Sequence, residues 1–390
     1  MLIANTVAAV LVPPNSPAAD AYALKAEILW AAAQGVSLLV PAVLLFAGLG
    51  ARVGTVLARW TGGNRYWTLT LFATFYLLVL ALALLPIRYW RAIVLEAEFG
   101  QPVQSLPQFL IGDFAPVLAQ IVVAALFLWL IFALIRRTPR TWWLWSALAL
   151  VPIGFVVLVA LPVFVDPLTA DYKPLQDRAL LAKIESFAAR CGIGRVPVFV
   201  GGDDDTVVGL GPTNRVFLED GIDRRETPEQ IEFTVAHELK HYVIGDNWKG
   251  LAIVFGFGLV GFWLTDVFGR RARGRFGFES LDDPASLPLI ALVLGAFWLC
   301  VLPLYNWEAR GIEKEADRFA YELSHRNHAA AELFAKWAQQ GLAQTRYDPF
   351  FMLFRQTHPS LAERIELANA YRPWATGEPF AYADVCRMER

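Results

Sequence analysis

Six long apolar stretches constrain the fold of this chain more than any other feature of its sequence. A transmembrane helix needs about 20 mostly apolar residues, and each stretch is of that order. The stretches run over residues 27–48, 67–86, 115–135, 142–164, 250–268 and 285–306. With 56% hydrophobic and only 18% charged residues, the composition is typical of a membrane protein rather than a soluble one. The sequence therefore predicts a polytopic α-helical membrane protein of about six spans, with the lipid bilayer as a partner.

The apolar stretches divide the 390 residues into five regions. We expect an N-terminal tail, a four-span region, a first polar segment, a transmembrane hairpin and a second polar segment, over residues 1–26, 27–164, 165–249, 250–306 and 307–390. The tail starts apolar but lacks the basic region and cleavage site of a signal peptide. Since only the hairpin separates the two polar segments, we expect them to form one water-facing domain.

The first polar segment alternates helix and strand signals. Apolar residues at helical spacing predict a helix over residues 175–190. Apolar runs separated by glycine-rich turns predict strands at 196–200, 206–210 and 215–218, the last two as a hairpin. The second polar segment is mostly helical in pattern, so the water-facing domain is expected to be of the α+β class.

The strongest local signal is a helix that carries the motif HExxH. Thr227 and Gln230 can form a capping box before it, and Gly245 is a suitable helix stop. Residues four apart lie on one face of a helix, so the imidazoles of His237 and His241 can reach one metal ion.

Glu238, next to the first histidine of the motif, is placed to take a proton from water, as in zinc metalloproteases. Such a site needs a third protein ligand and one open position. The candidates are four carboxylates after the sixth span: Glu308, Glu313, Glu315 and Glu322. Asp317 lies four residues after Glu313, a spacing that suits a ligand and a carboxylate that orients a ligating histidine.

The other three histidines fall into two groups. His325 and His328 occur in a polar stretch typical of a helix end, and we expect structural roles for both. His358 and Arg364, six residues apart, could donate hydrogen bonds to the oxyanion that forms when a carbonyl is attacked. Taken alone, they are more typical of a helix start and a salt bridge.

Charge and cysteine content exclude some classes. A net charge of −2 without a basic stripe gives no reason to expect a nucleic-acid partner. Cys191, Cys300 and Cys386 are few, odd in number and far apart. We therefore expect three unpaired thiols, with neither a disulfide framework nor a cysteine zinc site.

Three motifs in combination resemble the type I CAAX prenyl protease family, which are polytopic zinc metallopeptidases related more distantly to HtpX-like membrane proteases. The motifs are residues 236–241, Arg310 with 313–320, and 357–359 with Arg364 and Ile365. Weaker similarities are carried by residues 98–100 with 104–105, 162–175, 208–212 and 215–218. The resemblance therefore covers most of the chain from about residue 67 onward.

The resemblance implies a bundle of membrane helices with a gluzincin-like α+β zinc metallopeptidase domain. It implies one Zn2+ per chain, with His237, His241 and Glu313 as ligands and Glu238 as the catalytic base. It also implies that Asp317 orients a ligand from behind.

The family also implies how substrate is held. His358 and Arg364 would lie near the reacting carbonyl. An edge strand that contains Val207, Val208 and Gly209 would pair with an extended peptide and hold it over the metal.

The sequence departs from the family pattern at three points. Lys240 stands where the family usually has glycine, at a position that we expect to face solvent. Near Asp204, two aspartates replace an Asn-Ala pair of the substrate strand. The chain has six predicted spans where the eukaryotic prenyl proteases have seven, and the first is the one that is missing.

The implied reaction is hydrolysis of internal peptide bonds in a peptide or protein substrate, including lipid-modified substrates. An alternative is a membrane quality-control protease of broad specificity. A third possibility, from another class, is a non-catalytic membrane scaffold with a relict zinc site. The intact Glu238 argues against this last reading, because a relict site has no reason to keep its base.

The arginine distribution bears on orientation in a membrane, which we expect to be a bacterial inner membrane. Arginines gather in three loops, at residues 52–65, 136–140 and 270–275. In a six-span chain all three loops lie on one side, and the positive-inside rule places that side in the cytoplasm. The water-facing domain would then lie on the non-cytoplasmic face, whereas the eukaryotic relatives turn their zinc to the cytosol.

Overall fold

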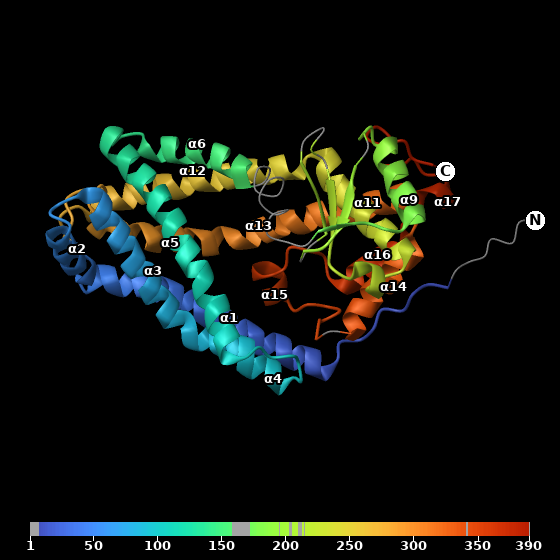
Figure 1. Cartoon of the computed structure of the whole chain (residues 1–390), viewed down its shortest axis with the longest axis horizontal. Helices are drawn as coiled ribbons and strands as arrows, with labels where there is room; N and C mark the ends of the chain where they lie inside the picture. The colour runs from blue at the N-terminus through green and yellow to red at the C-terminus, as the bar shows by residue number, and fades with distance from the viewer. Residues whose placement is uncertain are drawn as a thin grey trace, which may run out of the picture. The chain divides into compact units, whose positions relative to one another are not determined.

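The computed structural model describes residues 8–157, 172–194, 196–202, 205–209, 213, 215–340 and 342–389 (Figure 1). These residues form two compact units. Unit 1 draws on Met1–Asp20, Pro152–Ile253 and Pro303–Arg390, and unit 2 on Ala21–Val151 and Val254–Leu302. Unit 1 thus combines residues of both polar segments, and unit 2 holds most of the apolar stretches.

Five helical segments are long and apolar enough to cross a membrane: Pro17–Phe46, Arg65–Glu98, Leu106–Arg137, Asp246–Ala272 and Pro284–Ser324. A shorter apolar helix, α6 (Trp142–Phe155), occupies the start of the predicted fourth span. Residues 158–164 of that span lie outside the described residues. The prediction of a polytopic helical membrane protein with about six spans is confirmed.

The remaining elements of this part of the chain follow the local sequence. The helices are α1 (Pro17–Phe46), α2 (Leu49–Trp60), α3 (Arg65–Tyr89), α4 (Glu96–Glu98), α5 (Leu106–Arg137), α12 (Asp246–Ala272) and α13 (Leu287–Ser324). A π-helical turn (Trp90–Leu95) joins α3 to α4, and a 3-10 turn (Pro284–Ser286) precedes α13. α3 packs against α2 and α5. Asn64 begins α3 by accepting a hydrogen bond from the backbone N–H of Trp67 at 3.2 Å, which satisfies one of the free donors of the first turn.

Helix α13 is longer than the sequence suggested. It runs without a break past the predicted end of the sixth span at residue 306 and ends at Ser324. Its last turns bury Ala316, Phe319, Ala320 and Leu323, a spacing that forms one apolar stripe on a helix. The stripe packs into the core of unit 1. Glu313 therefore lies on the same helix as the sixth span and not on a separate one.

Unit 1 contains a small mixed sheet of four strands: β1 (Lys173–Pro174), β2 (Val198–Val200), β3 (Thr206–Val208) and β4 (Arg215–Leu218), in the order β1-β2-β4-β3. The pairing of β3 with β4 is antiparallel, with Val207 opposite Val216, so the predicted hairpin is confirmed. β2 pairs parallel to β4 and antiparallel to β1. β3 is therefore an edge strand of this sheet.

The helices of unit 1 are α9 (Arg178–Arg190), α10 (Ile222–Arg225), α11 (Pro228–Ile244), α14 (Asn327–Gln340), α15 (Pro349–Phe354), α16 (Leu361–Ala370) and α17 (Pro373–Thr376). α9 starts later than predicted because the Asp177 side chain accepts from the N–H groups of its first turn. α11 packs against α9, α14 and β3. Phe233 of α11 stacks on Tyr321 of α13 with ring centroids 5.4 Å apart, so aromatic contacts fix these two helices together inside unit 1.

A disulfide joins Cys191, at the end of α9, to Cys386, near the end of the chain. The prediction of three unpaired thiols is therefore wrong for these two, and Cys300 is the free one. The backbones of Arg190 and Arg387 are also hydrogen-bonded, N to O at 2.9 Å, which aligns the two segments. A separation of 195 residues carries no local sign of pairing, so spacing alone could not reveal the bridge.

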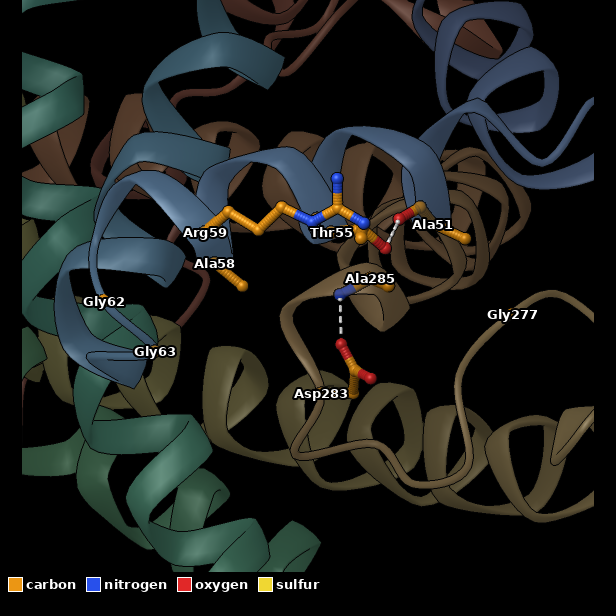
Figure 2. A pocket seen from close by; sticks show the side chains of 10 residues that line it. Ala51, Thr55, Ala58, Arg59, Gly62, Gly63, Gly277, Asp283 and Ala285 are labelled. Carbon is orange, nitrogen blue, oxygen red and sulfur yellow. Dashed lines mark hydrogen bonds between the residues drawn. The ribbon is translucent and has the colours of Figure 1, made fainter.

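Unit 2 contains a hollow of about 480 Å³ beside α2 (Figure 2). Its lining is mostly small residues, with Arg59 and Asp283 as the charged ones. Asp283 accepts a hydrogen bond from the backbone N–H of Ala285 at 2.9 Å, and the Thr55 hydroxyl donates to the Ala51 carbonyl at 2.9 Å. These polar groups thus serve local helix geometry.

Candidate metal centre

Helix α11 presents the HExxH motif as its local signals predicted. The side chain of Thr227 accepts from the backbone N–H of Gln230, and the side chain of Gln230 accepts from that of Thr227, at 3.3 and 3.0 Å. Gly245 ends the helix in the left-handed region, with φ 76°. One turn of regular helix separates His237 from His241, so their ring centroids lie 5.1 Å apart.

Glu313 of α13 completes a three-residue cluster with these histidines. Its two carboxylate oxygens lie 3.0 Å from His237 Nε2 and 3.5 Å from His241 Nε2. The two Nε2 atoms are 3.4 Å apart. Tetrahedral zinc, with bonds of about 2.0–2.1 Å, requires ligand atoms roughly 3.3 Å apart. The residues therefore fit a zinc ion with three protein ligands and one open position.

Each histidine of the cluster donates a hydrogen bond from its other ring nitrogen, Nδ1, to a carboxylate. His237 Nδ1 donates to Asp317 Oδ1, and His241 Nδ1 donates to Asp246 Oδ2, both at 3.0 Å. This contact turns Nε2 of each ring toward Glu313 and fixes the tautomer that can bind a metal. The predicted partner Asp317 is thus beside His237, and Asp246 is a partner that the sequence reading missed.

Arg364 lies behind the cluster. Its guanidinium binds Asp317 in a bidentate pair, with Nε to Oδ2 at 2.8 Å and Nη2 to Oδ1 at 2.6 Å, and both side chains are buried. A planar guanidinium matches a carboxylate in this way better than it matches a single oxygen. Arg364 is therefore a partner of Asp317, and its predicted place near the reacting carbonyl stays a prediction.

His358 reaches the cluster from the turn before α16. Its Nε2 lies 3.2 Å from Glu313 Oε2 and its side chain is 47% exposed. Its Nδ1 is 3.0 Å from the hydroxyl of Thr357. An imidazole that is open to solvent beside a candidate ligand can approach a bound substrate.

The electrostatics of the cluster favour a cation. Burial by itself lowers the pKa of His241, but hydrogen bonds to Asp246 and Glu313 outweigh it and raise the pKa to about 9. Burial also lowers the pKa of His237, but hydrogen bonds to Asp317 and Glu313 outweigh it, and the pKa is raised. Both imidazoles therefore attract positive charge, which a metal ion can supply in place of protons.

Burial raises the pKa of Glu238 despite the neighbouring histidines. A carboxylate with a raised pKa accepts a proton more readily, which suits a general base. The cluster and its surroundings hold four carboxyl groups, Glu238, Glu313, Asp317 and Asp246, and two buried cations, of which Lys240 pairs with Asp246 and Arg364 with Asp317. The formal excess of negative charge matches a divalent ion.

The other carboxylates and histidines considered from the sequence lie elsewhere. Glu322 is buried and accepts hydrogen bonds from the Tyr371 hydroxyl and the backbone N–H of Ala381. His325 stacks on Trp374 with centroids 4.1 Å apart, and His328 pairs with an acidic residue on its own helix. These contacts are structural and leave Glu313 as the carboxylate beside the two histidines.

Lys240 does not face solvent, so that expectation is wrong. Its side chain is 0% exposed, and Nζ donates to Asp246 Oδ2 at 2.7 Å and to the Ile312 carbonyl at 2.9 Å. Gly245 ends α11 in the left-handed region, and Asp246 follows it directly at the start of α12, where its carboxylate reaches Lys240. The signal that could have found this pair is an acidic residue placed directly after a helix-ending glycine.

The predicted substrate strand borders the helix that carries the motif. β3 packs against α11, and Val207 and Val208 are buried. Gly209 follows with φ 99°, a backbone conformation that favours glycine. The departure near Asp204 lies outside the described residues.

Known proteins with the same pattern include metallopeptidases. The family model of peptidase family M48 matches residues 174–372. The family model described as CAAX prenyl protease N-terminal, five membrane helices, matches residues 6–170. Together the two models cover the membrane helices and the cluster of His237, His241 and Glu313.

Individual relatives agree with these families. A Bacillus subtilis protein described as an uncharacterized metalloprotease, YhfN, is 32% identical over 60% of this chain and 58% of its own length, so the chain spans less than two thirds of it. A CAAX prenyl protease 1 homolog of Dictyostelium discoideum is 26% identical over 72% of this chain and 68% of its own.

A solved structure shows the same fold. The crystal structure of S. mikatae Ste24p superposes with a TM-score of 0.67 at 19% identity, and covers 83% of this chain and 81% of the other. Because the M48 model spans more than half of the sequence, the chain belongs to peptidase family M48, and it is a membrane metalloprotease.

Proposed function

We propose that this protein is a zinc-dependent endopeptidase that cleaves internal peptide bonds at or near the membrane. The observation that carries the proposal is the cluster of His237, His241 and Glu313, whose ligand atoms lie within 4.8 Å of one another. Glu238 stands next to the first ligand in the sequence. When bound there, zinc would supply a Lewis acid for the peptide carbonyl and would lower the pKa of a water at the open position.

Other side chains of the protein transfer the proton, orient the two histidines and stabilise the oxyanion. Glu238 takes the proton from the attacking water and passes it to the leaving amine, and burial, which raises its pKa, favours the uptake of that proton. Asp317 and Asp246 hold the two imidazoles in the ligating tautomer. His358 is the group with which we expect the developing oxyanion to be stabilised, because it is open to solvent beside Glu313.

The edge strand β3 supports a peptide substrate in extended form. A free strand edge offers unpaired N–H and C=O groups that a peptide can join by β-augmentation. Because β3 borders α11, residues Val207, Val208 and Gly209 would hold the peptide beside the motif. The CAAX prenyl protease homologs among the relatives favour a substrate with a lipid-modified C-terminus over an unmodified one.

We place the metal centre on the non-cytoplasmic face of a bacterial inner membrane. Three arginine-rich loops support this orientation through the positive-inside rule. The disulfide between Cys191 and Cys386 supports it independently, because disulfides persist in oxidising compartments and are rare in the cytosol. Both bridged segments belong to unit 1, which also holds the cluster.

The experiment is cleavage by the purified, detergent-solubilised full chain of three substrates: a prenylated CAAX peptide, the same peptide without lipid, and an unfolded membrane protein. Glu238→Gln is the control. We expect preferred cleavage of the prenylated peptide, with loss of turnover in the variant. Preferred cleavage of the unfolded protein would favour a quality-control protease. Wild-type turnover in Glu238→Gln, or absence of bound metal, would refute the proposed chemistry.

A further inference from the structure

Lys240 is a charged side chain that the proposed chemistry does not use, yet it is fully buried. An ammonium removed from water costs several kcal/mol unless ion pairs and hydrogen bonds compensate. Lys240 has two such partners, Asp246 Oδ2 at 2.7 Å and the Ile312 carbonyl at 2.9 Å. Glu315 Oε2, at 3.9 Å, adds only a distant charge. The position of the ammonium is therefore tightly determined.

The first partner connects Lys240 to one candidate ligand. Asp246 Oδ2 accepts from Lys240 Nζ at 2.7 Å and from His241 Nδ1 at 3.0 Å, so one oxygen serves both donors. If the ammonium were lost, this oxygen would keep only the contact with His241, and the carboxylate would lose its buried cationic partner. The orientation of the His241 ring depends on that oxygen.

The second partner connects Lys240 to another candidate ligand. Ile312 precedes Glu313 in α13, and a carbonyl oxygen has a second lone pair beyond the one used in the helix. The bond from Nζ ties the end of α11 to α13 one residue before the third ligand. A single ammonium thus touches the carboxylate behind His241 and the backbone beside Glu313.

The arrangement repeats what occurs behind His237. There the sequence of groups is imidazole, Asp317 and the buried cation Arg364. Behind His241 it is imidazole, Asp246 and the buried cation Lys240. In both cases a cation fixes and neutralises the carboxylate that orients a histidine.

We propose that Lys240 is a positioning residue of the metal centre, which holds His241 through Asp246 and Glu313 through the backbone of α13. The proposal rests on the proposed function, because it assumes that the cluster binds zinc. It predicts that Lys240 controls metal affinity without touching the metal.

Lys249 provides a matched control. Its Nζ lies 3.2 Å from the other oxygen of Asp246, but its side chain is 48% exposed. Lys249→Met removes the same charge from the same carboxylate without opening the buried contact. Lys240→Met removes the buried contact while keeping an unbranched side chain of similar size.

The test measures zinc affinity by competition with a chelator, and the visible absorption of the Co2+-loaded protein, on the purified full chain. We expect Lys240→Met to weaken affinity by about 10- to 100-fold, the usual effect of losing a partner behind a ligand, and to change the cobalt spectrum. Lys249→Met should stay within about twofold of wild type in affinity. In the double variant Lys240→Met/Asp246→Asn, the path through Asp246 is already interrupted, so the further loss of affinity relative to Asp246→Asn alone should be smaller than the loss caused by Lys240→Met in the wild-type protein.

Wild-type affinity and an unchanged cobalt spectrum in Lys240→Met would overturn the proposal and leave Lys240 as a contact between helices only. If Lys240→Met does not fold, Lys240→Gln replaces it. Its neutral amide removes the charge that neutralises Asp246, so zinc affinity should still fall, and wild-type affinity with an unchanged cobalt spectrum would overturn the proposal. Failure of the proposed function has a different signature. It would be seen as absent zinc binding in the wild-type protein, whatever residue 240 is.

Discussion

At the scale of single residues, the carboxylates around His237 and His241 have separate roles. Glu313 joins the two imidazoles from a different helix, and two further carboxylates turn the rings toward it. A ligand and a base are distinguished by geometry. The carboxylate oxygens of Glu313 lie within 3.5 Å of both Nε2 atoms, whereas Glu238 interacts with the two imidazoles through charge. Metal content and turnover should therefore separate the two roles.

We predict that His237→Ala, His241→Ala and Glu313→Ala each lose most of the bound zinc, whereas Glu238→Gln keeps zinc and loses activity. The reason is that three ligand atoms are needed to hold the ion and the base is not one of them. Metal analysis of the purified variants is the measurement. Full zinc content in Glu313→Ala would remove Glu313 from the ligand set.

Substitutions of Asp317 and of His358 should have different effects on zinc affinity and turnover. Asp317→Ala should weaken zinc affinity by roughly 10- to 100-fold, because it releases both His237 and Arg364. His358→Ala should keep zinc and lower turnover by roughly 100- to 1,000-fold, as expected for loss of an oxyanion donor. Chelator competition and steady-state kinetics on the same preparations compare the two. Loss of metal in His358→Ala would contradict its assigned role.

At the scale of elements, the residue that precedes the N-cap of α11 makes the stability of the protein depend on pH. Glu226 directly precedes the N-cap Thr227, and its Oε2 is buried without a hydrogen-bond partner among the described residues. Burial and the nearby Asp205 raise the pKa of Glu226 to about 7. The carboxyl is therefore neutral in the folded protein over a range where it is charged in the unfolded chain.

This difference predicts a pH-dependent stability. Between about pH 4.5 and 7 the folded state binds the proton more tightly, so the contribution of Glu226 to stability is present below pH 4.5 and is lost as the pH rises to about 7. Glu226→Gln should therefore stabilise the protein at pH 8 by roughly 1–2 kcal/mol, after allowance for solvent screening, and have little effect at pH 4.5. Thermal unfolding of both proteins at the two pH values is the measurement. The exposed Glu229, changed to Gln, is the control, and an equal effect at both pH values would exclude this explanation.

At the scale of the whole molecule, the number of spans fixes which segments share a face of the membrane. His237, His241 and Glu313 can bind one ion only if the segments before α12 and after the apolar part of α13 emerge on the same side. Two spans between them satisfy this condition. The choice of side is a separate matter, for which the arginine loops and the disulfide provide the arguments.

We predict that a cysteine at position 223 is labelled by an impermeant maleimide in intact cells and that one at position 273 is not. The Asp223→Cys and Arg273→Cys variants are made in a Cys300→Ser background, where Cys191 and Cys386 remain bridged. Labelling after membrane disruption controls for reactivity. The reverse pattern, or free Cys191 and Cys386 thiols in intact cells, would restore the cytosolic orientation. Opposite exposure of positions 223 and 372 would contradict the metal centre itself.

The sequence by itself determined the features that depend on residues close along the chain. The apolar stretches, the capping box at Thr227 and Gln230, the stop at Gly245 and the pairing of β3 with β4 all arise from contacts within a few residues to one hairpin. The HExxH spacing likewise places two imidazoles on one face of α11, because helix geometry is local. These elements were predicted, although some membrane helices extend well past their predicted ends, as α13 does to Ser324.

The tertiary structure alone decided which distant residues meet. His237 and Glu313 are 76 residues apart. Four glutamates after the sixth span were candidates on local grounds, with the spacing of Glu313 to Asp317 in favour of one, and the core of unit 1 orients α13 so that Glu313 is the one beside both histidines. Lys240 is buried because α13 covers it, and Cys191 meets Cys386 because the last residues return to α9. Such contacts depend on how packed apolar faces close long loops of chain, and no spacing rule within one sequence contains that information.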